Sequence, residues 1–172
     1  MAGGSKSKNK GSGYERELCK YLSAVFGGSF IRSANSGAFI GGKNAARKTN
    51  LSEGQIKGLK GDIVPPDDMP KLVLEAKFYA DFRFHQLMQP GPQPVLDEWI
   101  GQALDAIDDG DLWFVCFKVN LRGSYVVVPG AFEGRFVFGN HCRYASKHGI
   151  FLITDLKTFF ETNRDAIRQA AA

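Results

Sequence analysis

Two charged side chains stand in a segment that is otherwise typical of a buried strand. The segment Leu72–Lys77 is apolar except for Glu75 and Lys77. Because alternate side chains of a strand share a face, these two project together while the residues between them suit the core. A carboxylate and an ammonium group placed in this way indicate a site for chemistry, although an exposed charge cluster on an edge strand would show the same pattern.

Asp62 is expected to join this pair. Residues 65–70 are dense in turn-forming residues, so the chain should fold back as a hairpin and bring Asp62 opposite Glu75. Two carboxylates on facing strand positions, about 5 Å apart at Cβ, repel one another unless a cation lies between them. A divalent ion held by Asp62, Glu75, the backbone carbonyl of Ala76 and water fits this requirement. With Lys77 to stabilise negative charge or help deprotonate an attacking water, these parts suit hydrolysis of a phosphodiester.

The basic residues of the chain are concentrated ahead of this hairpin. The net charge of +4 divides unequally, because residues 1–61 hold eleven Lys and Arg against three Asp and Glu, whereas residues 62–172 hold eleven against fifteen. A long loop at 33–61 carries much of this charge and is expected to contact a phosphate backbone. A solvated insertion is the alternative. The basic residues of the loop at 33–61 that are expected to contact DNA are Lys43, Arg47, Lys48, Lys57 and Lys60.

The elements that must position these groups follow from the hydrophobic periodicity. We expect a flexible basic tail over 1–13 and then a single domain over 14–172, with a C-terminal extension after about residue 130. Helices are predicted at 14–26, 51–58, 95–108 and from a cap at Thr154 or Asp155 to about 168. Strands are predicted at 29–32, 61–64, 71–77, 112–119, 124–129, 135–138 and 150–153. This order predicts a mixed α/β domain with helices packed on a central sheet.

Composition excludes several classes of protein. The 172 residues are 44% hydrophobic, too apolar for a disordered chain, and no apolar run approaches the roughly 18 residues of a membrane span. The start lacks the apolar core of a secretory signal. Three cysteines without Cys-x-x-Cys spacing argue against a disulfide framework, so a reducing cytoplasm is the expected location.

Two further segments carry a resemblance to a known family. With Gly61-Asp62 and Glu75-Ala76-Lys77 as core motifs, the chain resembles nucleases of the PD-(D/E)xK superfamily, and its opening resembles the archaeal-type and phage Holliday junction resolvases. The segment Lys10–Leu18 is similar to their first-helix motif, Gly-x-x-x-Glu-Arg-Glu-Leu, and Phe30–Gly37 resembles their Arg-Ser-x-x-Ser segment. Gly61 stands where that superfamily commonly has proline, and the stretch from Ser36 to Asp62 is longer than in the compact archaeal proteins.

The resemblance implies a restriction-endonuclease-like core and a role for each matching residue. Asp62 and Glu75 would be metal ligands, Lys77 the catalytic lysine, and Glu15 the acid of the first helix and a further candidate ligand. Arg32, Ser33 and Ser36 would lie near the substrate backbone. Helical geometry alone does not separate Glu15 from Glu17, which flank the apolar stripe of their helix about equally.

The implied activity is a Mg²⁺-dependent endonuclease, with Mn²⁺ as a substitute, that resolves four-way DNA junctions as a homodimer in recombination or repair. The alternatives are another nuclease on the same fold (of restriction, repair or phage DNA-processing type) and a non-catalytic nucleic-acid binding module. Gln102 is expected to be a solvated residue. The aromatic residues of 78–84 could stack on bases or pack in the core.

Overall fold

The computed structural model describes residues 3–34, 49 and 51–172. Its centre is a seven-stranded sheet in the order β1-β2-β3-β4-β5-β7-β6. Strands β3 and β4 run parallel, and the other neighbours are antiparallel. The strands are β1 (Ile31–Arg32), β2 (Ile63–Val64), β3 (Leu72–Tyr79), β4 (Leu112–Val119), β5 (Gly123–Pro129), β6 (His141–Ser146) and β7 (Gly149–Asp155).

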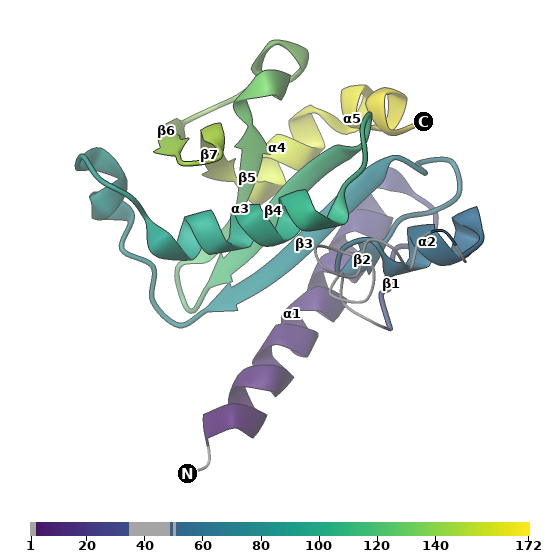
Figure 1. The fold of residues 1–172 in the computed structure, drawn as a ribbon, viewed down its shortest axis with the longest axis horizontal. Helices are drawn as coiled ribbons and strands as arrows, with labels where there is room; N and C mark the ends of the chain where they lie inside the picture. Colours follow the sequence, from purple (N-terminus) through teal and green to yellow (C-terminus); the bar gives the residue numbers. More distant parts are fainter. Residues whose placement is uncertain (1–2, 35–48, 50) are drawn as a thin grey trace.

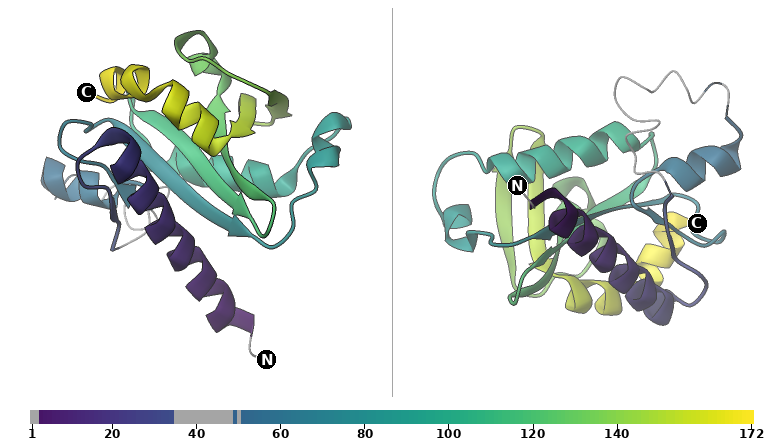
Figure 2. Two further views of the ribbon diagram at one scale, coloured as in Figure 1. Left: turned by 180° about the vertical axis from the view of Figure 1, so that it is seen from behind. Right: turned by 90° about the horizontal axis from the view of Figure 1, so that it is seen from below.

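Helices cover both faces of this sheet (Figures 1 and 2). Helix α1 (Gly3–Phe26), α4 (Leu156–Thr162) and α5 (Arg164–Ala171) lie on one face, and α3 (Pro94–Ala106) lies on the other. The short helix α2 (Glu53–Leu59) precedes β2 beside the edge of the sheet. Two 3₁₀ helices, η3 (Phe84–Met88) and η4 (Gly130–Arg135), complete the described elements. The prediction of a mixed α/β sheet flanked by helices is confirmed.

Strand β3 separates two hydrophobic cores. Leu72, Leu74 and Ala76 pack in the core beneath α1, whereas Val73 packs in the core beneath α3. The two-residue periodicity expected of this strand is therefore confirmed, and it directs Glu75 and Lys77 toward the α3 face. Both faces of β3 are apolar, so each charged group in it must be compensated by a partner.

The beginning of α1 differs from the prediction. The helix starts at Gly3, whereas the composition of residues 1–13 predicts a flexible tail that gives way to helix only at Tyr14. The packed turns of α1, which bury Leu18, Leu22 and Phe26, supply a nucleus. Extending an existing helix adds one hydrogen bond for each residue ordered, so propagation toward the N-terminus costs far less than nucleation.

The strand predicted at 135–138 is wrong. Arg135 is the last residue of η4, and the strand that joins the sheet is β6 at His141–Ser146. The Asn163 side chain takes the backbone groups that a neighbouring strand would have used, because Val137 N donates to its Oδ1 at 2.7 Å and its Nδ2 donates to Val137 O at 2.8 Å. Phe136 meanwhile buries its ring against Phe114 and Phe159.

Residues after 130 build one side of the fold. Strands β6 and β7 extend the sheet, and α4 and α5 contribute Phe159, Phe160 and Ile167 to the core that α1 covers. The expected cap at Asp155 is present, since its Oδ1 accepts from Thr158 N at 2.8 Å. The predicted final helix is divided at Asn163 into α4 and α5. None of the described helices has the length and apolarity needed to cross a membrane.

Candidate active site

The hairpin of β2 and β3 places Asp62 opposite Glu75, as predicted. Ile63 pairs with Leu74 in the antiparallel register, which puts the preceding residue of one strand across from the following residue of the other. The Asp62 backbone is fixed on both sides, because its N–H donates to Leu74 O at 2.9 Å and its carbonyl accepts from Ser33 N at 2.9 Å. The position of the Asp62 carboxylate is thus set by β3 and by the chain leaving β1.

Gly61 makes this close approach feasible. Its φ is +65°, and a Cβ at this position would lie 2.6 Å from the carbonyl oxygen of Leu74. Glycine adopts the left-handed conformation without steric cost, whereas proline is locked near −65°. The glycine found where the superfamily commonly has proline is therefore required by this backbone.

Asp62, Glu75 and Lys77 lie close together at the end of the hairpin that is away from its turn. Asp62 and Glu75 are buried, with exposed fractions of 8% and 4%. Lys77 Nζ lies 3.0 Å from Glu75 Oε2 and 3.9 Å from Asp62 Oδ2. Asp62 Oδ2 also accepts a hydrogen bond from the backbone N–H of Ala76 at 2.8 Å. One ammonium group and one amide therefore offset two buried carboxylates, which leaves the cluster with an excess of negative charge.

The protonation of Glu75 reflects this excess. Burial, together with the charge of Asp62, raises the pKa of Glu75 to about 7, although Lys77 acts in the opposite direction. An oxygen donor set of two carboxylates that are incompletely compensated fits a hard divalent cation such as Mg²⁺. The residues present are therefore compatible with the metal that the sequence predicts.

Ala76 can supply a third oxygen. In a strand the N–H and carbonyl of one residue point to the same side, and the Ala76 N–H points toward Asp62, so its carbonyl also faces the side of β2. Within the described part of the chain, no group of three or more His, Cys, Asp and Glu side chains gathers around a common point. A cation here would thus take two carboxylates, a carbonyl and outer ligands from water or substrate, which is a usual arrangement for Mg²⁺.

Glu15 on α1 contacts Arg32 and no member of this cluster among the contacts that the structure describes. Its carboxylate accepts a hydrogen bond from Arg32 Nε on β1, and the side chains are 16% and 43% exposed. This contact raises the pKa of Arg32, and the charge of Asp62 adds to the effect, so the guanidinium is within electrostatic reach of the candidate metal site. Glu17 points to a different partner, Lys118, with Nζ 2.6 Å from Oε2. The structure thus distinguishes Glu15, which contacts Arg32, from Glu17, which contacts Lys118. Helical periodicity alone could not make this distinction.

Two of the predicted DNA-binding residues have partners within the protein. Ser33 is 5% exposed, and its hydroxyl donates to Gly58 O at 3.0 Å. Lys60 Nζ lies 2.7 Å from Asp111 and 2.9 Å from Asp108, with 14% of its side chain exposed. Burial lowers the pKa of Lys60, but hydrogen bonds to the two aspartates outweigh this and raise it. Sequence position does not reveal these internal partners, and the expected contact of Ser33 and Lys60 with DNA stays a prediction.

The other candidates for DNA binding have side chains outside the described part of the structure. Lys57 lies on α2, at a position whose side chain is outside the described part of the structure. Ser36, Lys43, Arg47 and Lys48 lie outside the described residues altogether. Their expected contact with DNA remains a prediction.

Gln102 lies at the surface, whereas Phe82 and Phe84 of the aromatic segment 78–84 pack in or against the core. Gln102 is exposed on α3 and donates to Glu98 Oε1 at 3.3 Å, as expected of a solvated side chain. Phe82 is buried in the core beneath α3, and Phe84 packs against that core. Tyr79 differs because 39% of it is exposed at the end of β3.

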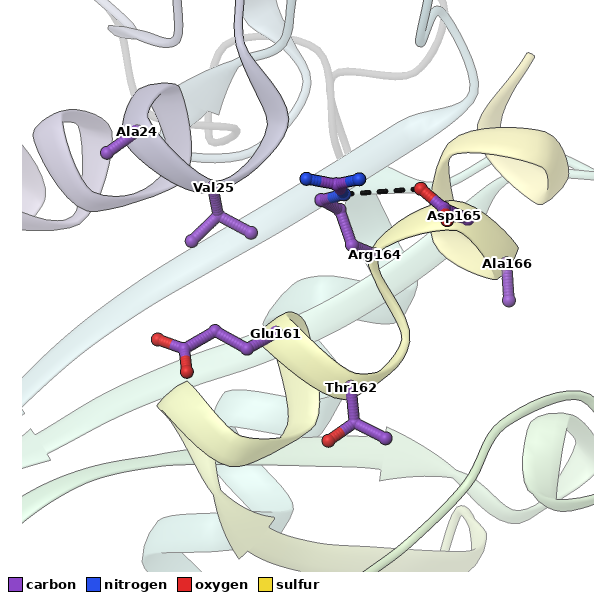
Figure 3. Close-up of a pocket in the computed structure, with 7 residues that line it drawn as sticks. All are labelled: Ala24, Val25, Glu161, Thr162, Arg164, Asp165 and Ala166. Atoms are coloured by element: carbon purple, nitrogen blue, oxygen red, sulfur yellow. Dashed lines mark hydrogen bonds and ion pairs between the residues drawn. The ribbon is translucent and has the colours of Figure 1, made fainter.

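A hollow of about 360 Å³ on the opposite face is not part of this site (Figure 3). It lies between the end of α1, at Ala24 and Val25, and the residues that join α4 to α5. Arg164 and Asp165 form an exposed ion pair at 3.2 Å on its rim. Glu75 and Lys77 project to the other side of the sheet, so this hollow does not communicate with them.

Comparison with known proteins agrees with the geometry. A family described as "Phage putative PDDEXK endonuclease" matches residues 6–165, which include Glu15, Asp62, Glu75 and Lys77. No curated protein and no solved structure matches the chain significantly.

Proposed function

Because the chain belongs to this family of phage PDDEXK endonucleases, we propose that it hydrolyses DNA phosphodiesters with Mg²⁺ held by Asp62 and Glu75. The PD-(D/E)xK resemblance and the restriction-endonuclease-like fold are confirmed, and the chain is a nuclease of this type. The observation that supports the assignment of the site is the meeting of Asp62, Glu75 and Lys77 at the end of one hairpin.

Each residue has a distinct part in this proposal. Asp62, Glu75 and the Ala76 carbonyl would hold the cation, which lowers the pKa of a bound water and offsets charge on the phosphate. Lys77 Nζ, 3.0 Å from Glu75, would lie beside the phosphate that is cleaved and would stabilise the negative charge that develops on it. Arg32 would orient the phosphate from β1, with Glu15 holding its guanidinium in place.

We further propose four-way junctions as the substrate and a homodimer as the active form. Support comes from the two segments that resemble the junction resolvases, which contain Glu15 and Arg32 respectively. These segments are distant in sequence, and the two residues form an ion pair. Mn²⁺ is expected to replace Mg²⁺. A second candidate, favoured by the phage family description, is a nuclease that processes other phage DNA structures such as ends or nicks.

A cleavage assay separates these possibilities. A synthetic four-way junction and a linear duplex built from the same arms are incubated with the protein and Mg²⁺, and Glu75→Ala serves as the control. Cleavage of the junction alone would support the resolvase proposal, whereas equal cleavage of both substrates would contradict it and favour general DNA processing. If neither Mg²⁺ nor Mn²⁺ supports any cleavage, or if Glu75→Ala cuts as well as wild type, the proposed chemistry is wrong.

A further inference from the structure

Strand β3 leads from the candidate active site to a second cavity. Tyr79 is two residues beyond Lys77 and four beyond Glu75, so all three share a face of the strand, and Tyr79 lies about 7 Å along it from Lys77. A cavity of about 270 Å³ opens there, between the end of β3, the loop through η3 and the first turn of α3. In Figure 1 this loop leaves the end of β3 and returns to the start of α3.

The cavity has an aromatic wall. Tyr79 packs against Trp99 with ring centroids 5.5 Å apart and an interplanar angle of 75°, while 39% of the residue stays exposed. Phe82, also part of the lining, is buried and packs on Phe117 at 5.4 Å. A rigidly supported ring with an exposed part is the kind of surface on which a planar heterocycle stacks.

Polar groups complete the cavity. Gln86 and Gln93 line it, and Gln93 Nε2 donates to Gln86 O at 3.2 Å, which holds the two residues together. Amide side chains of this type pair with the hydrogen-bonding edges of bases. Arg83 is exposed at the lining and can meet a phosphate, and the acidic neighbour Asp81 is offset by Arg122 at 4.0 Å.

We propose that this cavity receives one unstacked base of the DNA strand that is bound for cleavage at Asp62 and Glu75. The proposal rests on the proposed function and adds to it a preference for DNA with unpaired bases near the cut. The volume is below the roughly 300–1,000 Å³ of sites for drug-sized ligands, so a single base suits it better than a whole dinucleotide or cofactor. Tyr79 in the cavity wall and Lys77 in the candidate active site share one face of β3. This arrangement favours a nucleotide of the bound DNA over an unrelated small ligand.

Binding of a fluorescent oligonucleotide tests the proposal without any cleavage. A single-stranded oligonucleotide with one 2-aminopurine is titrated with the protein in EDTA, since stacking on an aromatic ring quenches this base. Wild type should bind and quench, and Tyr79→Leu should weaken binding about tenfold and abolish the quenching. Tyr21→Leu is the matched control, because it changes a half-buried tyrosine on the opposite face of the sheet and should behave as wild type.

A second variant guards against misfolding. Arg83 is exposed, so Arg83→Gln should leave the fold intact and weaken binding severalfold by removing one phosphate contact. Equal binding and quenching by wild type, Tyr79→Leu and Arg83→Gln would overturn the proposal, as would absence of oligonucleotide binding. Absence of cleavage with Mg²⁺ while Tyr79-dependent quenching persists would instead contradict only the proposed nuclease activity, because the titration contains no metal.

Discussion

The Asp62 carboxylate accepts a hydrogen bond from the backbone N–H of Ala76 at 2.8 Å, so a side chain continues the pairing of β2 with β3 after the backbone pairing has ended. This bond engages Oδ2 and holds the carboxylate in place beside Lys77. The same residue thus has a structural and a proposed catalytic role, and these two roles can be separated by mutation.

Asp62→Asn and Asp62→Ala should therefore differ in stability and agree in activity. Asn retains a carbonyl oxygen that can accept from Ala76 N, whereas Ala leaves a buried N–H unpaired at a cost of about 1–3 kcal/mol. Both variants lose the anionic ligand, so both should lose cleavage by at least about a hundredfold in the presence of Mg²⁺. Urea denaturation and cleavage rates, measured on the same preparations, check the two effects. Full activity of Asp62→Asn would exclude this carboxylate as a ligand.

Glu75→Gln is expected to abolish cleavage without a loss of stability. Glu75 is buried against Asp62, and the removal of its charge relieves repulsion between two carboxylates at the expense of the contact with Lys77. In the absence of metal, the melting temperature should stay the same or rise. Mg²⁺ at a hundredfold excess over its dissociation constant should stabilise wild type by about 2.7 kcal/mol and Glu75→Gln much less.

The matched control for this experiment is Glu133→Gln. Glu133 forms an ion pair with Arg143 at 3.0 Å on the surface, so the same substitution there should change neither cleavage nor the stabilisation by Mg²⁺. If Mg²⁺ stabilises Glu75→Gln and wild type equally, the ion binds at a place that does not include Glu75.

Lys77→Met should separate metal binding from catalysis. Lys77 is the side chain that offsets both carboxylates, so its removal increases the negative charge that a cation meets. We expect Mg²⁺ to bind at least as tightly to Lys77→Met as to wild type, as measured by calorimetry. Cleavage should nevertheless fall by at least about a hundredfold, because the positive charge beside the phosphate is lost. Weaker Mg²⁺ binding by this variant would show that Lys77 acts by positioning Glu75.

Gly61→Ala should destabilise the protein by more than the usual cost of a left-handed residue. Adopting φ of +65° costs an L-residue about 1–2 kcal/mol, and the new methyl group would also meet the Leu74 carbonyl oxygen at 2.6 Å. Denaturation in urea should show a loss above this value, and cleavage should fall because Asp62 is displaced. Gly110→Ala, with a φ of +89° and no atom within 4 Å of the new Cβ, controls for the conformational cost alone.

The hairpin and its charges could be predicted from sequence because they depend on local rules. Alternation along Leu72–Lys77 and the turn residues before it define the face and the register, and a register error of one residue would have moved Glu75 into the core beneath α1. Tertiary partners could not be predicted in the same way. Nothing adjacent to Lys60 in sequence indicates that Asp108 and Asp111 bind it, and Val137 gives no sign that Asn163 will satisfy its backbone.

Arg32 and Lys60, both expected from sequence to bind DNA, should now behave differently. Arg32 is 43% exposed beside the candidate site, whereas Lys60 is 14% exposed and bound to two aspartates. Arg32→Met should weaken DNA binding and reduce the slope of log affinity against log salt by about 1, as loss of one phosphate contact does. Lys60→Met should leave that slope unchanged and instead lower stability, because Asp111 would lose its buried partner. Measuring affinity for a four-way junction at several salt concentrations, in EDTA to prevent cleavage, distinguishes the two variants. A reduced slope for Lys60→Met would show that Lys60 contacts DNA.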